Sequence, residues 1–469
     1  MARVSFLIFG ALVFSNVFGY TQNNSTYPLK PNLDYPEVFL SQYLQIESIS
    51  GNERDAGEFF AYSCRLAGLH VRVFTHERDS YNFAASLFPL NSAKPNVIFL
   101  THIDVVPAAN HNDWLHDPFG GAIAEGYVWG RGAIDNKGAG VMQFFALKHF
   151  VELARHNDLP YNVTLLAVSN EELMGGLGAG IIVNQFIDEL NPVAVFGEGG
   201  AGMRGIINAM PRKVVFGIET AQKRSLWFNL KSTGSSAGHG SVPAARYPAK
   251  EIIRASNAIL KLKPEIIVTS VVRKMLKGLS VHETGIRRLA LRNMKLISPL
   301  IAPYLRNDEM TASILTNTIM LTSITSDATA QNQVAQALKA SFDARLLPGV
   351  DATLFLKEIE FAIKPFEVEL EIVSKPAESP SSKENSYYFH FKDALQEVYP
   401  DAHVIPILFP AVNDNWFFRS AGIPTFGITP VIFTRELIHT IHNANERMPI
   451  DALYQGIDVF KAFIRRIID

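Results

Sequence analysis

The sequence predicts an α/β fold: a doubly wound, mostly parallel sheet with an inserted α+β domain. Three observations support this prediction. Short apolar runs alternate with helical patterns through residues 70–200, as they do in βαβ units. Near Ser225 the pattern changes to the polar–apolar alternation of half-exposed antiparallel strands. From Glu384 the alternation of helices and apolar strands resumes.

The chain has 469 residues, which exceeds one ordinary hydrophobic core, so two domains are expected. Hydrophobic residues make up 48% and charged residues 19%, as in globular proteins rather than disordered ones. The formal net charge is −2, so the composition indicates no basic face for nucleic acid.

The first 19 residues have the features of a secretory signal peptide. Arg3 supplies a positive start, residues 4–14 are apolar, and residues 17–19 (VFG) suit cleavage near Gly19. An uncleaved membrane anchor is the alternative, although the stretch is short for a span. We therefore expect a secreted, extracellular protein, with the endomembrane lumen as the other possible location.

Three triplets fit the N-glycosylation pattern, and they begin at Asn23, Asn24 and Asn162. The first two overlap in a polar tail and are better candidates than Asn162, which stands at the start of an expected strand. A secreted glycoprotein is therefore expected. Cys64 is the only cysteine, so no internal disulfide stabilises the core.

In the first part of the chain, helices and strands alternate, apart from an irregular stretch rich in Gly, Trp and Asp at 113–132. Helices are expected at 35–48, 52–67, 136–155 and 179–189, and strands at 71–74, 82–87, 96–100, 163–168 and 193–196. After residue 384 we expect helices at 384–398, 415–420 and from 450, with strands near 404 and at 424–428.

The inserted domain is predicted to span residues 225–375, so that residues 20–224 and 376–469 form the catalytic domain. Its expected strands are 225–231, 311–325, 335–345 and 368–373, and its expected helices are 248–262 and 353–363. Residues 266–304 are amphipathic and basic. Two interpretations remain for them: a helical excursion that covers the sheet, or an element that contacts lipid or lipoprotein.

Thr101-His102-Ile103-Asp104 follows the apolar run 96–100, which is typical of a buried parallel strand. His102 and Asp104 are two residues apart and therefore share one face of the strand. They stand at its carboxyl end, where open α/β sheets bind ligands. By itself the pair is either a metal ligand with the group that orients it or a core histidine satisfied by a carboxylate.

Further candidates lie at or beyond other expected strand ends: Asp135, Glu171-Glu172, Glu198 and His442. Clustered buried carboxylates stay protonated unless a cation compensates them. Two imidazoles and three carboxylates suit two zinc ions. A shared carboxylate can hold such ions about 3.5–4 Å apart around a hydroxide. In a Glu-Glu pair, one side chain can bind metal while the other remains a base.

These residues lie in motifs that resemble those of the co-catalytic zinc peptidases, the family of aminoacylase-1, carboxypeptidase S and acetylornithine deacetylase. The order is the same over nearly the whole mature chain. The signal peptide, the His239 segment and the lid motifs are most similar to the secreted N-fatty-acyl-amino acid synthase/hydrolase and carboxypeptidase S branch. The motifs are residues 101–104 (THID), 130–138 (GRGAIDNKG), 170–172 (NEE), 197–200 (GEGG) and 441–446 (IHNANE).

The resemblance implies two zinc ions and a ligand set for each. One ion would be bound by His102, Asp135 and Glu198. The other would be bound by Asp135, Glu172 and His442, so that Asp135 bridges the pair. His439 lies one turn earlier than His442 and is the alternative ligand, but the following Asn-Glu favours His442.

The resemblance also implies roles for the residues around the ions. Glu171 would be the general base that takes a proton from the bridging water and passes it to the leaving amine. Asp104 would orient His102. The family often has a cis peptide after the bridging Asp, so the Asp135-Asn136 bond is expected to be cis.

The inserted domain resembles the lid of this family. Residues 235–243 (SSAGHGSVP) match a motif whose histidine, here His239, donates to the developing oxyanion, often from a partner subunit; a surface histidine in a turn is the alternative. Asn332 and Arg345 match an Asn and an Arg that hold substrate. Arg345 can grip a carboxylate bidentately, and a structural salt bridge is its alternative. A homodimer through the lid is therefore expected.

Three departures from the family pattern concern substrate shape more than catalysis. Gly197 stands where this branch usually has Asp before the Glu. Residues 333–335 are Gln-Val-Ala in place of the usual Val-Ile-Pro after the lid Asn. Residues 413–415 are Asn-Asp-Asn in place of a more usual Asp-x-Arg.

The sequence therefore predicts a secreted di-zinc amidohydrolase. Its expected substrate is a small molecule, an N-acyl amino acid with a free carboxylate, whose amide it cleaves or reversibly forms. The alternative activity is that of a metallocarboxypeptidase or dipeptidase acting on peptides. The non-enzymatic alternative is a secreted binding protein with a catalytically inactive peptidase fold. This alternative predicts that metal ligands or the general base have been lost, but the sequence retains every expected ligand and the base.

Overall fold

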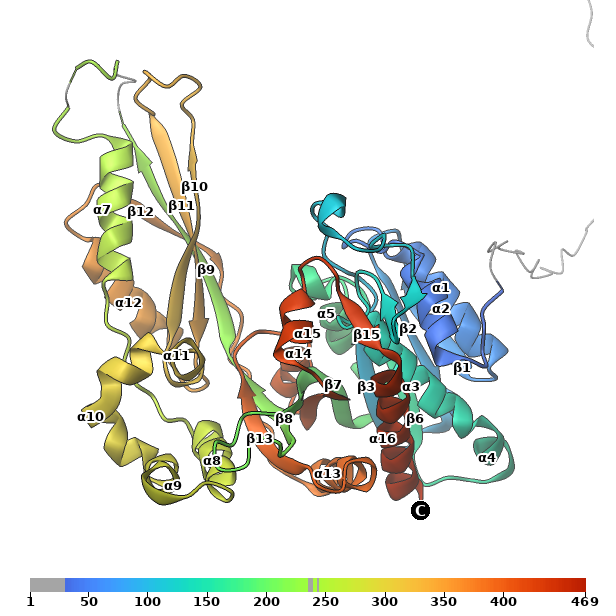
Figure 1. Cartoon of the computed structure of the whole chain (residues 1–469). Coiled ribbons are helices and arrows are strands. Elements are labelled where there is room, and N and C mark those ends of the chain that lie inside the picture. Colours follow the sequence, from blue (N-terminus) through green and yellow to red (C-terminus); the bar gives the residue numbers. More distant parts are fainter. Residues whose placement is uncertain (1–29, 235–238, 243) are drawn as a thin grey trace, which may run out of the picture. The chain divides into compact units, whose positions relative to one another are not determined.

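The computed structural model describes residues 30–234, 239–242 and 244–469 (Figure 1). The expected signal peptide, Asn23 and Asn24 lie outside these residues, as do residues 235–238 and 243 of the lid motif. In the part of the chain that is described, no helix combines the length and the apolar character that a membrane span requires.

An eight-stranded sheet organises the first and last parts of the chain, in the order β1-β2-β6-β3-β7-β14-β8-β13. The pairs β6–β3, β3–β7, β7–β14 and β8–β13 are parallel, which confirms the predicted mostly parallel α/β sheet. The antiparallel exceptions are β1–β2, β2–β6 and the pairing of β8 with β7 and β14. The strands are β1 (His70–His76), β2 (Tyr81–Ser86), β3 (Asn96–His102), β6 (Asn162–Val168), β7 (Pro192–Met203), β8 (Val215–Gln222), β13 (His403–Phe409) and β14 (Thr425–Ile432).

Helices cover both faces of this sheet. On one face, Phe99 of β3 contacts Phe460 and Phe463 of the last helix. On the other face, Ile98 and Leu100 pack with residues of the segment 179–190 and of α14. The first face carries α1 (Pro36–Leu44), α2 (Arg54–Leu66), α3 (Lys137–His149), α13 (Ser386–Val398) and α16 (Ile450–Ile468). The second carries α5 (Ala179–Ile181), a π-helical turn (Ile182–Phe186), α6 (Ile187–Leu190) and α14 (Asn415–Ser420).

A second, antiparallel sheet has the order β10-β11-β9-β12, and α7 and α12 pack with it (Figure 1). Its core includes Phe228 and Phe342, whose rings stack with centroids 4.9 Å apart. The predicted domain limits at residues 225 and 375 lie next to its first and last strands and stay a prediction. The elements are β9 (Arg224–Thr233), α7 (Pro248–Leu260), β10 (Thr318–Ser326), β11 (Ala337–Leu346), α12 (Ala352–Ile363) and β12 (Glu369–Ser374).

Residues 263–317 form a helical excursion. The expected strand 311–325 is wrong in its first part, because Asp308 caps a helix there by accepting the backbone N–H of Thr311. The excursion packs Val272, Leu276 and Leu315 against Leu408 of β13, so one of its sides does cover the sheet. The helices are α8 (Ser270–Ser280), α9 (Gly285–Arg292), α10 (Met294–Asn307) and α11 (Glu309–Leu315).

Some elements differ from expectation. The segment expected as one helix over 136–155 is split into α3 and α4 (Val151–His156). A small sheet joins distant parts of the chain: β4 (Ile123–Ala124), β5 (Tyr127–Trp129) and β15 (Arg447–Pro449). Asn162 is buried, and its side chain exchanges hydrogen bonds with the backbone of Phe88, so the folded chain offers no glycosylation acceptor there. Cys64 is buried and unpaired.

Candidate metal centre

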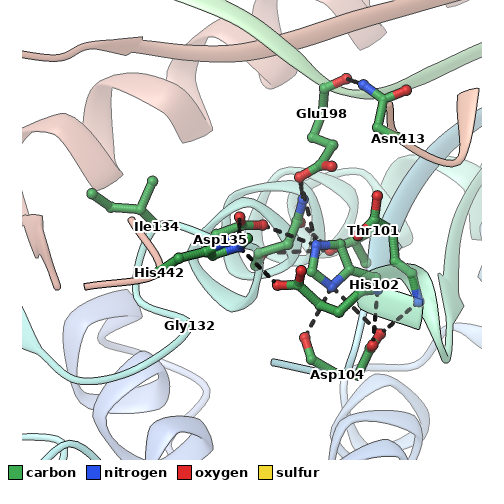
Figure 2. Close-up of polar contacts among 12 residues, drawn as sticks. Thr101, His102, Asp104, Gly132, Ile134, Asp135, Glu198, Asn413 and His442 are labelled. Atoms are coloured by element: carbon green, nitrogen blue, oxygen red, sulfur yellow. Dashed lines mark hydrogen bonds and ion pairs between the residues drawn. The ribbon is translucent and has the colours of Figure 1, made fainter. Parts of the chain in front are cut away.

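The predicted site residues meet at one edge of the eight-stranded sheet (Figure 2). His102 is the last residue of β3, and Glu172 follows β6 in a short turn. Glu198 lies within β7 on the other side of β3. Because these three strands are parallel neighbours, their carboxyl ends come together. Asp135 precedes α3, and His442 follows α15 (Arg435–Thr440).

Asp135 faces both imidazoles. Its Oδ1 lies 3.0 Å from Nε2 of His102, and its Oδ2 lies 3.1 Å from Nε2 of His442. Glu198 Oε2 lies 3.5 Å from the same nitrogen of His102. Glu172 Oε1 lies 3.1 Å from that of His442. The residues therefore form two groups that share the carboxylate of Asp135, while the alternative ligand His439 is exposed and belongs to neither group.

These groups fit metal ions in chemistry and spacing. Ligands at about 2.0–2.2 Å around a tetrahedral ion lie roughly 3.3 Å from one another, and the facing atoms here are 3.0–3.5 Å apart. Burial raises the pKa of Glu198 and of Glu172, so it disfavours the charged form of both, and a bound cation would favour that form. Burial also opposes ionisation of Asp135, but hydrogen bonds with the two histidines hold its pKa well below the usual range.

Asp104 contacts both His102 and the turn that carries Glu171 and Glu172. Nδ1 of His102 donates to the backbone carbonyl of Asp104 at 2.9 Å, which leaves the Nε2 lone pair for a metal. The Asp104 carboxylate lies 3.6 Å from Nδ1 of His102. It accepts the backbone N–H groups of Glu171 and Glu172 at 3.0 and 3.1 Å, and the Ser50 hydroxyl at 2.7 Å. The orienting role of Asp104 thus extends beyond the predicted contact with His102.

Glu171 lies near His102 and Glu172 but differs from the other carboxylates in its contacts. In the described structure its carboxylate receives no hydrogen bond, whereas that of Glu172 lies against His442. Burial, and then the negative charge of Glu198, raises the pKa of Glu171 well above its ordinary value. A poorly solvated carboxylate with a raised pKa is suited to accept a proton in catalysis. Glu171 also forms a third possible ligand group with His102 and Glu172.

The loop that carries Asp135 is held by Glu446, a residue to which the sequence reasoning assigned no role. This fully buried carboxylate pairs with Arg131 at 2.7 Å. It also accepts the backbone N–H groups of Gly132, Ile134 and Asp135 at 3.1, 2.8 and 3.0 Å. The motif after His442 contained this glutamate, but the distance along the chain hid its partners. The expected cis peptide bond follows, between Asp135 and Asn136.

A second buried hydrogen-bond network contacts the backbone carbonyl of Glu198. Asn413 and Asn415 donate to the backbone carbonyl of Glu198 at 3.0 and 2.8 Å. Both amides also donate to Glu219, at 2.8 and 3.3 Å, and the other oxygen of Glu219 pairs with buried Arg419. Glu219 and Arg419 were missed by the sequence reasoning, because a charged pair on two buried elements leaves no periodic pattern.

Two of the noted departures from the family pattern pack against each other. A Cβ at Gly197 would lie 2.2 Å from Oδ1 of Asn415, far inside van der Waals contact. The glycine therefore gives Asn415 the space it occupies behind Glu198.

We expect Asn415→Ala to weaken metal binding about tenfold, because supporting groups of this kind typically contribute 10–100-fold to metal affinity. The substitution leaves the carbonyl of Glu198 with one donor in place of two. Metal affinity is measured by competition with a chromogenic chelator. Asn52→Ala is the matched control, since that amide accepts from Arg78 at the surface. An affinity within twofold of the unsubstituted chain would contradict a supporting role for Asn415.

Among the lid residues, the structure brings His239 and Asn332 together. The amide nitrogen of Asn332 lies 3.1 Å from Nε2 of His239, and Nδ1 lies 2.7 Å from the Ser241 hydroxyl. Arg345 on β11 donates twice to Asp343, at 2.8 and 3.0 Å, which is the structural salt bridge foreseen as its alternative. The hydrogen bonds of these lid residues in the described structure are with one another and with lid neighbours, and none is with a residue of the metal groups.

Lys223 adds a positive charge near Arg345 that the sequence reasoning missed. The Lys223 side chain is buried, and its ammonium group donates to the Thr318 hydroxyl at 3.3 Å. Burial, with the charge of Arg345, lowers the pKa of Lys223 to about 8. A small hollow adjoins it, and this hollow is lined by Lys223, Ser225, Ser379 and Trp416 among others. Arg345 is paired with Asp343, whereas Lys223 has no ion pair in the described structure, so positive charge remains for an anionic ligand.

Comparison with known proteins agrees with this site. The family model "Peptidase family M20/M25/M40" matches residues 98–466. Aminoacylase-1 of Mus musculus is 24% identical over 452 residues, which cover 92% of this chain and 96% of that protein. The N-fatty-acyl-amino acid synthase/hydrolase PM20D1 of Xenopus tropicalis is 25% identical over 377 residues, which cover 78% of this chain and 72% of that protein.

Solved structures share the fold. The M20 family metallo-carboxypeptidase Sso-CP2 of Sulfolobus solfataricus has a TM-score of 0.70 at 20% identity, covering 92% of this chain and 99% of that one. Human carnosine dipeptidase 1 has a TM-score of 0.66 at 15% identity, covering 93% and 96%. The family match spans most of the chain and contains every residue of the two ligand groups. The chain therefore belongs to peptidase family M20/M25/M40 and is a metallohydrolase.

Proposed function

We propose that this protein is a secreted di-zinc amidohydrolase that cleaves, or reversibly forms, the amide bond of N-acyl amino acids with a free carboxylate. The observation that carries the proposal is the pair of histidine–carboxylate groups sharing Asp135, with the unengaged carboxylate of Glu171 beside them. Relatives named as aminoacylase-1 and as an N-fatty-acyl-amino acid synthase/hydrolase support this substrate class. A relative in Bacillus subtilis is described as a dinuclear metal-binding peptidase, which supports two ions.

In this mechanism, one zinc ion would be held by His102, Asp135 and Glu198, and the other by Asp135, Glu172 and His442. When bound, the ions supply Lewis-acid activation of the amide carbonyl and of the attacking water. Glu171 accepts a proton from that water and delivers it to the departing amine nitrogen, so one carboxylate serves as base and then as acid.

The lid supplies the remaining contacts of the proposal. His239, steadied by Asn332, donates to the oxyanion that develops on the amide carbonyl, and it reaches the site from a partner subunit in a homodimer formed through the lid. Arg345, with Lys223 near it, binds the free carboxylate of the amino acid, and Asn332 also contacts the substrate. If the substrate carboxylate replaced Asp343 as the partner of Arg345, the Arg345 guanidinium could bind the substrate carboxylate through two hydrogen bonds.

The secreted location rests on the N-terminal signal sequence, with the endomembrane lumen as the alternative. Cleavage near Gly19 and glycosylation at Asn23 or Asn24 would follow from entry into the secretory pathway. Both are checked by N-terminal sequencing of protein recovered from the culture medium and by its mobility before and after deglycosylation. Protein that stays inside the cell with residues 1–19 intact would contradict secretion.

A substrate panel tests the activity. Long-chain N-acyl amino acids, N-acetyl amino acids and dipeptides are compared by kcat/KM, with matched amides of each amino acid that lack the free carboxylate. We expect N-acyl amino acids to be preferred, and loss of the carboxylate to lower kcat/KM by about 10–100-fold, since the charged hydrogen bonds between substrate and Arg345 are lost. Preference for dipeptides would favour the peptidase alternative. Activity that persists after chelation would contradict the metal mechanism.

A further inference from the structure

Helices α9 and α10 each expose large apolar side chains. The apolar stripe consists of Ile286 and Leu289 on α9 and of Leu296, Leu300 and Tyr304 on α10, with exposed fractions of 86%, 61%, 77%, 82% and 71%. Within the described residues, six large apolar side chains are more than 70% exposed, and four of them belong to this stripe; the other two are Leu115 and Phe361. Such a concentration marks an interaction surface.

Helix α10, which carries three of the five stripe residues, is already anchored on its other side, whereas α9 packs against the same cluster through the partly buried Leu291. On α10, Met294, Ser298, Ala302 and Leu305 are buried, and Met294 and Leu305 join the cluster that contains Leu408 of β13. Leu296 is two residues from Met294, and at about 100° per residue it lies on the opposite face. The next turns repeat this arrangement at Leu300 and Tyr304. The internal core is thus satisfied, and the stripe remains outside it.

The charge around the stripe is strongly one-sided. Residues 270–307 contain a single acidic residue, Glu283, which is buried and paired with Arg287 and two backbone N–H groups. Asp308 and Glu309 follow directly, and Lys274 pairs with Glu384, but the basic residues still outnumber these acidic ones. In the described structure, Arg288, Arg292 and Lys295 are exposed and have no ion-pair partner. The whole chain has a net charge of −2, so this is a local excess. The basic residues of the segment are Arg273, Lys274, Lys277, Arg287, Arg288, Arg292, Lys295 and Arg306.

From these observations we propose that the apolar stripe docks on an anionic lipid surface. Apolar side chains enter the boundary between headgroups and acyl chains, and the adjacent Arg and Lys side chains meet the lipid phosphates and carboxylates. Tyr304 suits this boundary because its ring is apolar and its hydroxyl is polar. A symmetric contact of the apolar stripe with a second copy is disfavoured, since a twofold interface would place this basic segment against itself; the homodimer proposed above would therefore use another surface of the lid.

Vesicle flotation of the full-length secreted protein tests the proposal. Vesicles of phosphatidylcholine are compared with vesicles containing about one quarter phosphatidylserine, whose negative surface potential attracts basic segments. We expect the protein to float with the anionic vesicles. The double substitution Leu296→Ser with Leu300→Ser should reduce the bound fraction at least tenfold. Arg288→Glu with Arg292→Glu should remove the preference for anionic vesicles.

The matched control is Phe361→Ser, which removes an equally exposed side chain from α12 and should float like the unsubstituted protein. Thermal unfolding shows whether each variant is folded. Because flotation does not require activity, the test stands even if the proposed substrate is wrong. The proposal is overturned if the unsubstituted protein ignores anionic vesicles, or if the Leu296/Leu300 variant floats equally well. It is also overturned if that variant instead converts a lipid-free dimer into monomers, which would identify a second copy as the occupant.

Discussion

Glu171→Gln should lower kcat by about 10²–10⁴-fold, the range expected for loss of a general base, while the metal content stays unchanged. The amide fills the same space but cannot accept the proton of the attacking water. In the described structure the Glu171 carboxylate receives no hydrogen bond, and burial raises its pKa well above the ordinary value. The substitution therefore removes a proton acceptor and few structural contacts. Steady-state kinetics and metal analysis of the same preparation measure both quantities.

The neighbouring glutamate provides the decisive comparison. Glu172→Gln should release metal, because Glu172 lies 3.1 Å from Nε2 of His442 in the group that also contains Asp135. Glu152→Gln changes an exposed surface glutamate and should alter neither quantity. If Glu171→Gln loses metal as well, Glu171 is a ligand, as its proximity to His102 and Glu172 allows. A kcat within tenfold of the unsubstituted protein would exclude Glu171 as the base.

The sequence predicted those parts of the site that depend on strand ends. His102 and the Glu171-Glu172 pair each come shortly after a largely apolar run, so their strands could be recognised in the sequence. The geometry of a parallel sheet then brings the side chains together. The family motifs added Asp135 and His442, which stand on loops. Local patterns alone do not locate these two, because their neighbourhood is formed by residues about 300 positions apart.

The elements that were missed contain buried polar groups satisfied at long range. β8 was not predicted, because Gly217 and Glu219 interrupt its apolar run; Glu219 is tolerated inside the sheet only through its pairing with Arg419 and the two asparagine amides. Glu446 is similar, since its partners lie more than 300 residues earlier. A periodicity argument counts such residues as surface positions, and only the fold reveals their partners.

Asp135→Ala should abolish both turnover and the binding of both metal ions, because the two groups share this carboxylate. Its two oxygens face different imidazoles, at 3.0 Å from His102 and 3.1 Å from His442. Without it, each group retains one histidine and one glutamate. Burial raises the pKa of each glutamate, which disfavours the charged form that binds metal. Metal analysis after dialysis should find neither ion, and added zinc should no longer raise the Tm.

His442→Ala distinguishes a shared carboxylate from two separate sites. This substitution removes a ligand from one group and leaves His102, Asp135 and Glu198 in the other, so we expect one ion to remain per chain. Asp158→Ala, at an exposed position paired with Lys94, should retain both ions. If Asp135→Ala also retained one ion, the carboxylate would serve a single site. Loss of both ions with Asp135→Ala and of one with His442→Ala is the pattern that only a bridging Asp135 explains, because a ligand of one site alone cannot empty the other.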